Sequence, residues 1–485
     1  MRWLARLLGG KSGASERRSP AIFLTNTLSG TKELFIPLKQ GVVSLYTCGP
    51  TVYSRQHIGG LRASIFSDTL ARTLAAAGYR VRRVINITDV GHLVGDGDRG
   101  QDKMSLGARR EETSPAAVAE RYAKLFIEDL AELNVDVEDI RFPRATDYIR
   151  EQIALAKTLE EKGFAYRLPD GLYFDTQKFQ NYGKLAGFGE ALRAAGARVE
   201  VVPGKHSPAD FALWRDAKPR DLQQWDSPWG RGNPGWHLEC AAMIRALLGP
   251  QIDIHTGGED LASVHHNNEI AESEAATGRP FVRYWMHNAF LNMGGEKISK
   301  SLGNEMYLSD IVAKGYSPLA LRYFFLQAQY RTPLSFSWDA LAGAQEALER
   351  LVRLAGEVSV EANGKSLRSA IQSRFLALMR DDLATPQALG LLWETLKSEE
   401  YRPEEKLGLL EEAETHLGLS LLSAPAAEAA GAELPRAVEN LLARRSAARK
   451  IKDFPEADRL RTLIERSGYH VEDSSEGTVL TKQTK

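Results

Sequence analysis

Residues 42–89 read VVSLYTCGPTVYSRQHIGGLRASIFSDTLARTLAAAGYRVRRVINITD. The apolar run 42–48 predicts a buried strand, which Gly49-Pro50 ends, and residues 80–89 predict a second strand. Between them, apolar residues recur at helical spacing and predict a helix over 57–76: Ile58, Leu61, Ile65, Phe66, Leu70 and Leu74. A strand, a helix and a second strand in this order are typical of a parallel sheet, so an α/β fold is expected.

The strand and helix pattern returns late in the chain. A strand is predicted at 252–254 and a helix at 266–276, after a stretch that carries a hairpin turn signal at 168–172. Beyond Phe336 the character changes: from Leu341 to Leu396 apolar residues fall on helical periods with no strand pattern between them, which indicates a helix bundle. The sequence therefore predicts a sheet domain that is split by an insertion and is followed by a bundle and a small terminal unit.

The composition restricts the class of protein. Two cysteines in 485 residues cannot build a disulfide framework, and no run of about 18 apolar residues suggests a membrane span. The formal net charge is -1, so contact with nucleic acid would need a local basic patch. Residues 436–461 offer one, with eight Lys and Arg against four acids. The basic leader 1–21 is expected to be a disordered tail, although its lack of acids before Glu16 also fits a transit peptide.

Both cysteines lie in segments that look like parts of a site. Cys48 ends the first predicted strand, and Cys240 ends the run GWHLEC. His265 and Glu269 stand four residues apart, so a helix places both side chains on one face. Two sulfurs, one imidazole and one carboxylate are a ligand set typical of zinc. The plainer interpretation is that a free cysteine is a small buried hydrophobe.

Two further motifs suit a nucleotide. His57-Ile58-Gly59-Gly60 stands at a predicted helix start, where free N–H groups and the helix dipole bind anions. Lys297-Ile298-Ser299-Lys300-Ser301 follows two glycines, so its lysines can close over a triphosphate. Taken alone, the first motif also fits an ordinary helix cap and the second a solvated basic loop.

Together, and in this order, the two motifs resemble the signatures of class I aminoacyl-tRNA synthetases. Other segments are similar to cysteinyl-tRNA synthetases in particular: 46–53, 86–90, 225–230, 234–240, 284–287, 381–386 and 447–454. The resemblance spans about residues 22–478. It implies a cytoplasmic, monomeric cysteine–tRNA ligase that uses L-cysteine, ATP with Mg²⁺, and tRNA(Cys), passes through a cysteinyl-adenylate, and does not contact a membrane.

The resemblance also implies roles for individual residues. One zinc ion per chain would bind the substrate thiolate and would be held by Cys48, Cys240, His265 and Glu269. The expected catalytic residues are His57, Lys297 and Lys300. The expected nucleotide contacts are His57, Gly59, Gly60, Asp260 and Lys300. The expected amino-acid pocket contains Thr47, Gly49, Trp236 and His237, although Trp236 fits a core position equally well.

The same resemblance divides the chain into segments. The catalytic domain is expected to be Rossmann-like. The expected ranges are the leader 1–21, the first catalytic half 22–145, the insertion 146–224, the second half with the KISKS loop 225–335, the helical anticodon-side bundle 336–423, the linker 424–435, and a small basic domain 436–485.

One departure leaves rival functions open. Gly60 stands where the family pattern has a second histidine, so adenylate formation should be slow unless Arg62 or His255 substitutes. One rival is a cysteine ligase that acts on a small amine acceptor. The other is a catalytically weak tRNA-binding paralogue.

Overall fold

The computed structural model describes residues 20–94, 100–185, 203–218, 221–298, 303–422, 436–450, 453–467, 469–474 and 477–482. The predicted linker, nearly all of the leader, and Lys300 lie outside the described residues. For Lys297 the structure describes the backbone only.

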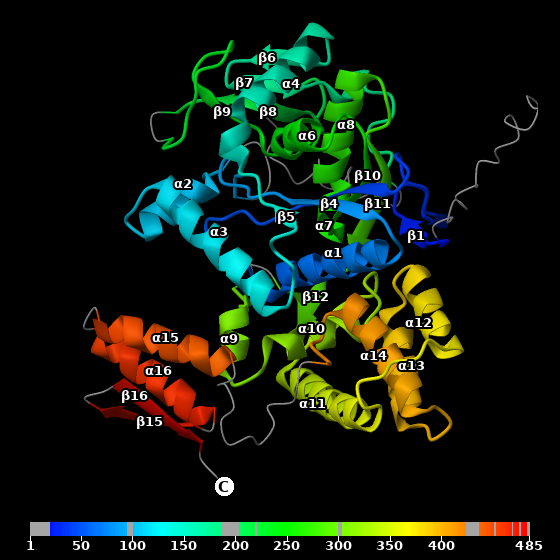
Figure 1. Cartoon of the computed structure of the whole chain (residues 1–485). Coiled ribbons are helices and arrows are strands. Elements are labelled where there is room, and N and C mark those ends of the chain that lie inside the picture. The colour runs from blue at the N-terminus through cyan, green and yellow to red at the C-terminus, as the bar shows by residue number, and fades with distance from the viewer. Residues whose placement is uncertain are drawn as a thin grey trace, which may run out of the picture.

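A five-stranded parallel sheet forms the centre of the molecule (Figure 1). Its strands, in spatial order, are β11 (Val282–Asn288), β10 (Ile252–Gly258), β3 (Val42–Thr47), β4 (Arg80–Ile85) and β5 (Ile140–Arg141). Every neighbouring pair runs parallel. The predicted α/β class is therefore confirmed. The helix between the first two of these strands in the chain is α1 (Ile58–Ala76), close to the predicted 57–76.

Helices cover both faces of this sheet. In Figure 1, α1 lies below it, and α6 (Trp236–Leu247) and α8 (His265–Thr277) lie above it. The short α7 (Glu259–Ser263) joins β10 to α8. The crossover from β4 to β5 contains α2 (Lys103–Arg110) and α3 (Pro115–Glu132), and a hairpin of β1 (Phe23–Asn26) and β2 (Thr31–Leu34) precedes β3.

An antiparallel sheet with its own core is inserted in the chain between β5 and β10 of the parallel sheet. It pairs β6 (Ala165–Leu168), β7 (Gly171–Phe174), β8 (Phe211–Asp216) and β9 (Gly232–Pro234), and α4 (Ile149–Glu161) packs against it. The tight connection from β6 to β7 is Pro169-Asp170, as the turn signal predicts. This sheet extends to β9, beyond residue 224, where the sequence places the end of the insertion.

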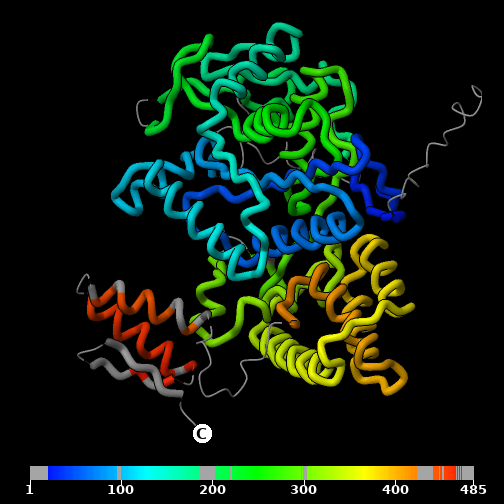
Figure 2. Tube along the Cα trace, in the orientation of Figure 1, coloured from blue at the N-terminus to red at the C-terminus, as the bar shows by residue number. Residues whose placement is uncertain are grey.

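The C-terminal half is mainly helical. The segment after β11 contains β12 (Leu291–Met293), β13 (Glu296–Lys297), α9 (Leu308–Ala313), α10 (Pro318–Leu326) and β14 (Leu334–Phe336). The bundle follows, with α11 (Trp338–Glu361), α12 (Ala370–Arg380), α13 (Thr385–Lys397) and α14 (Pro403–Leu417). The last unit has α15 (Arg436–Lys450), α16 (Phe454–Arg466) and a hairpin of β15 (Tyr469–Ser474) and β16 (Gly477–Lys482). Figure 2 shows its two helices apart from the bundle.

A buried arginine joins the parallel-sheet domain to the bundle. Arg322 of α10 is fully buried, and its Nη2 lies 2.6 Å from Oδ2 of Asp68 on α1. Its other nitrogens donate to the carbonyl oxygens of Leu417 at 2.7 Å and Leu133 at 2.9 Å. Burial alone would raise the pKa of Asp68. The combined effect of the neighbouring arginines is larger and lowers this pKa to about 2. The two domains therefore share one charged contact that has no access to water.

Replacing Arg322 with Met tests this contact. The variant leaves the Asp68 carboxylate buried without its closest partner, so we expect a loss of about 3–5 kcal/mol in the free energy of unfolding. Denaturant titration measures it. The control is Arg353→Met, because Arg353 forms an exposed ion pair at 3.9 Å with Glu357 and such pairs contribute less than about 1 kcal/mol. Equal losses in the two variants would contradict the role of Arg322.

The pKa of Asp68 predicts an acid dependence. Its folded value of about 2 lies below an ordinary value of about 3.9, so the ionised carboxylate stabilises the fold above about pH 4. That stabilisation is lost as the pH falls toward 2. We expect the difference in unfolding free energy between the wild type and Asp68→Asn to be constant near neutral pH and to shrink below about pH 4. A difference that does not change with pH would contradict the assignment.

Candidate metal centre and nucleotide site

The carboxyl ends of two neighbouring strands hold the first part of the site. Cys48 directly follows β3, and its N–H donates to the carbonyl oxygen of Thr256 on β10 at 3.0 Å. The next residue, Gly49, donates its N–H to Oδ1 of Asn86 at 2.8 Å. A Cβ on Gly49 would lie 1.8 Å from the Asn86 carbonyl oxygen, so this position requires glycine. The strand end thereby holds the Cys48 side chain at the edge of the sheet.

The structure brings the four predicted ligands together. Cys240 comes from α6, and His265 and Glu269 lie on one face of α8. One donor atom from each of these residues and from Cys48 lies within 4.8 Å of all the others. Tetrahedral zinc, with bonds of about 2.0–2.3 Å, holds its donors about 3.3–3.8 Å apart. A small contraction of the cluster therefore fits the ion.

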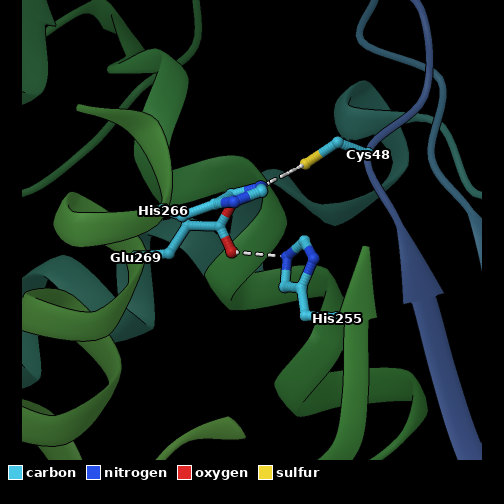
Figure 3. A group of neighbouring side chains, drawn as sticks. All are labelled: Cys48, His255, His266 and Glu269. Carbon is cyan, nitrogen blue, oxygen red and sulfur yellow. Dashed lines mark hydrogen bonds and ion pairs between the residues drawn. The ribbon is translucent and has the colours of Figure 1, made fainter. Parts of the chain in front are cut away.

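A second group of donors overlaps this quartet. Cys48 and Glu269 also lie within 4.8 Å of His255 and His266 (Figure 3). Nε2 of His266 is 3.4 Å from the Cys48 sulfur, and Nε2 of His255 is 2.8 Å from Oε2 of Glu269. The quartet with two thiolates has the softer donors, which favour zinc over harder ions. We therefore assign His255 and His266 to the surroundings of the quartet.

Hydrogen bonds fix these surrounding histidines. Nδ1 of His266 is 2.7 Å from Nε2 of His287, whose Nδ1 is 2.8 Å from the hydroxyl of Thr27. Nδ1 of His237 is 2.9 Å from Nδ1 of His265. His265 therefore keeps Nε2 toward the cluster, where it lies 2.8 Å from Oε1 of Glu269. A partner on the second ring nitrogen is how a protein orients a histidine ligand.

Electrostatic interactions within the quartet favour ionised side chains. The hydrogen bond with Cys48 lowers the pKa of Cys240 to about 6, whereas burial raises the pKa of Cys48. Burial alone would raise the pKa of Glu269. The combined effect of His255 and His265 is larger and lowers this pKa to about 2. Burial alone would lower the pKa of His265. The combined effect of its neighbours, chiefly the Glu269 carboxylate, is larger and raises this pKa to about 10. One thiol and one carboxyl group are thus ionised near neutral pH, with His265 as their counter-charge.

The predicted pocket residues take different positions around the quartet. The Trp236 ring stacks on the His265 ring at 4.3 Å and on the His92 ring at 3.9 Å, so it lies directly beside the cluster. Thr47 is buried, and its hydroxyl is 2.6 Å from that of Ser67 and 2.8 Å from that of Thr256. The Thr47 hydroxyl therefore bonds β3 to α1 and β10 rather than facing a ligand.

The nucleotide motif forms the start of α1. His57 is the N-cap, and its Nδ1 accepts a hydrogen bond from the Gly60 N–H at 3.3 Å. In the neutral ring, Nε2 is then the nitrogen that bears hydrogen. Asp260 is exposed in the first turn of α7, at the end of β10. Lys297 belongs to β13, which pairs with β12.

Arg62 and His255 are both unavailable to replace the histidine that is missing at Gly60. Arg62 is buried, and its guanidinium donates to the carbonyl oxygens of Ala289, Phe290 and Thr332. His255 is fully buried against Glu269. The geometry therefore gives no support to Arg62 or His255 as a substitute for a side chain at Gly60.

Sequence reasoning missed most of the histidine cluster. Five of the ten histidines gather around the quartet: His237, His255, His265, His266 and His287. Two of them lie inside central strands, His255 in β10 and His287 in β11. A histidine among the apolar residues of such a strand was the available signal, because a buried imidazole needs a polar partner.

Within the described residues, every helix is too short or too polar to cross a bilayer.

Similarity to solved structures supports the fold. Mycobacterium tuberculosis methionyl-tRNA synthetase in complex with methionyl-adenylate matches with a TM-score of 0.55 at 17% identity, over 79% of this chain and 91% of that one. The LeuRS of the Agrobacterium radiobacter K84 ternary complex with tRNA and LeuAMS matches with a TM-score of 0.59 at 12% identity, over 81% and 87%. At these identities the likeness concerns the fold alone.

Sequence comparison is more specific. A family model described as "tRNA synthetases class I (C) catalytic domain" matches residues 34–346, and one described as "Cysteinyl-tRNA ligase anticodon binding domain" matches residues 431–478. Cysteine–tRNA ligase 1 of Burkholderia lata is 44% identical over 94% of this chain and 95% of its own length. The cysteine–tRNA ligase of Chlorobium chlorochromatii is 40% identical over 95% and 99%. These matches confirm the predicted resemblance, and the chain belongs to the cysteinyl-tRNA ligase family of class I tRNA synthetases.

Proposed function

We propose that this chain joins L-cysteine to tRNA(Cys) in an ATP-dependent reaction that passes through a cysteinyl-adenylate. One observation carries the proposal: Cys48, Cys240, His265 and Glu269 converge at the sheet edge from which the chain continues to the His57 end of α1. A metal centre suited to sulfur and an anion-binding helix start thus lie along one short stretch of chain. Cysteine and ATP are the two substrates that such a pair of sites would hold.

The donor set favours zinc as the resident ion. When bound, zinc supplies a Lewis acid that deprotonates a thiol and prefers sulfur to a hydroxyl oxygen, so it separates cysteine from serine where pocket volume alone could not. The chain contributes the four donors, and His237 orients the His265 ring. Trp236 would wall the amino-acid side of the pocket together with Gly49.

The reaction itself needs little acid–base chemistry from the chain. A carboxylate oxygen of cysteine attacks the α-phosphorus of ATP, a new O–P bond forms, the α–β anhydride bond breaks, and pyrophosphate leaves. A hydroxyl group at the tRNA acceptor end then attacks the activated carbonyl carbon, and AMP leaves. His57, Lys297 and Lys300 would stabilise phosphoryl charge, with Mg²⁺ on the nucleotide. Asp260 would accept from the ribose hydroxyls.

The terminal segments support a large acceptor. A small amine would need neither the bundle at 336–423 nor the basic unit at 436–485, and the anticodon-domain similarity covers most of that unit. Phosphate contacts from its lysines and arginines would hold the tRNA. We propose a monomer that acts in the cytoplasm. Its segments follow the ranges expected from the sequence, except that the inserted sheet extends through β9 to Pro234.

Metal analysis of paired variants tests the ligand assignment. We expect Cys240→Ser to lose most of its bound zinc and its cysteine-dependent ATP–pyrophosphate exchange, because a hydroxyl is a poor zinc ligand. His266→Ala is the matched control from the overlapping donor group, and it should retain zinc. The reverse result, with zinc lost from His266→Ala and kept by Cys240→Ser, would move the ion to His255 and His266.

Two variants of His57 separate its capping role from its catalytic role. His57→Ala removes both the N-cap and the phosphate donor, and we expect exchange to fall about 10²–10³-fold. His57→Asn restores a good N-cap, so its unfolding midpoint should return toward the wild-type value while exchange remains low. If His57→Asn recovers exchange together with stability, His57 is a helix cap only.

A further inference from the structure

The two residues before α1 fold back over its first turn. Gly59 and Gly60 form this turn and carry no side chains of their own. A Cβ on Gly59 would lie 3.0 Å from Cε1 and Nδ1 of the His57 ring. A Cβ on Gly60 would lie 1.7 Å from Nε2 of Gln56 and 2.5 Å from its Cδ. The Gln56 amide therefore fills the space that a side chain at position 60 would need.

This amide lies in a place suited to an anionic ligand. Gln56 is half-buried, and its side chain has no hydrogen-bond partner among the residues that the structure describes. The first turn of α1 contains no acidic residue of its own that would offset the partial positive charge of the helix N-terminus. The group of Gln56 nearest to this turn is Nε2, which offers two N–H donors.

We propose that Gln56 is a further catalytic residue, whose Nε2 donates a hydrogen bond to a phosphate oxygen of ATP beside His57. This donor would stabilise the charge that develops as the α–β anhydride bond breaks and pyrophosphate leaves. Gln56 thus takes the place of a side chain at residue 60, and neither Arg62 nor His255 is required. The inference rests on the proposed adenylation of cysteine.

The first test is cysteine-dependent ATP–pyrophosphate exchange by Gln56→Ala. We expect kcat/KM for ATP to fall about 10–100-fold, the cost of removing one uncharged donor to a phosphate group. The KM for cysteine, the zinc content and the unfolding midpoint should not change. Gln387→Ala is the matched control, because Gln387 is exposed on α13 in the bundle, and it should match the wild type throughout.

The shared space gives a second test. In Gly60→His the imidazole displaces the Gln56 amide, so we expect no gain in exchange. The double variant Gln56→Ala/Gly60→His vacates the space for the imidazole, and we expect it to exceed Gln56→Ala by about tenfold in kcat/KM for ATP. The effects of the two substitutions are then strongly non-additive, as expected for groups that compete for one position.

Two outcomes would overturn the inference. One is a Gln56→Ala variant with wild-type kcat/KM for ATP, and the other is a double variant whose loss is the product of the two single losses. Failure of the proposed function gives a different result, because the wild-type protein would then show no cysteine-dependent exchange at all.

Discussion

The parallel pairing of β3 with β10 is the contact on which the rest of the site depends. It sets Leu45, Tyr46 and Thr47 beside Ile254, His255 and Thr256, which lie 209 residues further along the chain. Parallel strands end at the same edge of a sheet, so Cys48 emerges next to the segment that leads through α7 into α8. The insertion between the two halves returns the chain through α6, which supplies Cys240. The sulfur atoms of Cys48 and Cys240, far apart in the sequence, therefore come together because β3 pairs with β10.

The same edge of the sheet also positions the start of α1, where we propose that the nucleotide binds. The chain leaves β3 through Cys48 and enters α1 at His57, so one short segment links the proposed metal centre to the helix start that we propose binds phosphate. Further along α1, Asp68 is held by Arg322 of α10, whose guanidinium also binds the end of α14. One helix therefore carries the proposed phosphate-binding residues at its start and the contact with the bundle along its length. Its position is fixed by buried charge as well as by apolar packing.

Local patterns in the sequence predicted much of this arrangement. Periodicity predicted α1 and three of the five strands of the parallel sheet, β3, β4 and β10, to within about four residues, but it did not predict β5 or β11. The four-residue spacing of His265 and Glu269 placed both on one face of α8. How α8 packs against the sheet is not a local property, so the approach of His255 to Glu269 could not be predicted from spacing. The same holds for Arg322, whose partners come from three distant segments. Gln56 escaped notice because its significance depends on the absence of a side chain at Gly60.

X-ray absorption at the zinc edge tests the central claim most directly, which is that the quartet holds an ion that recognises its amino acid by sulfur. The free protein should show two sulfur ligands at about 2.3 Å and lighter donors at about 2.0–2.2 Å. Addition of L-cysteine should raise the number of sulfur ligands to three, and L-serine should leave it at two. A sulfur count that L-cysteine does not change would contradict the account.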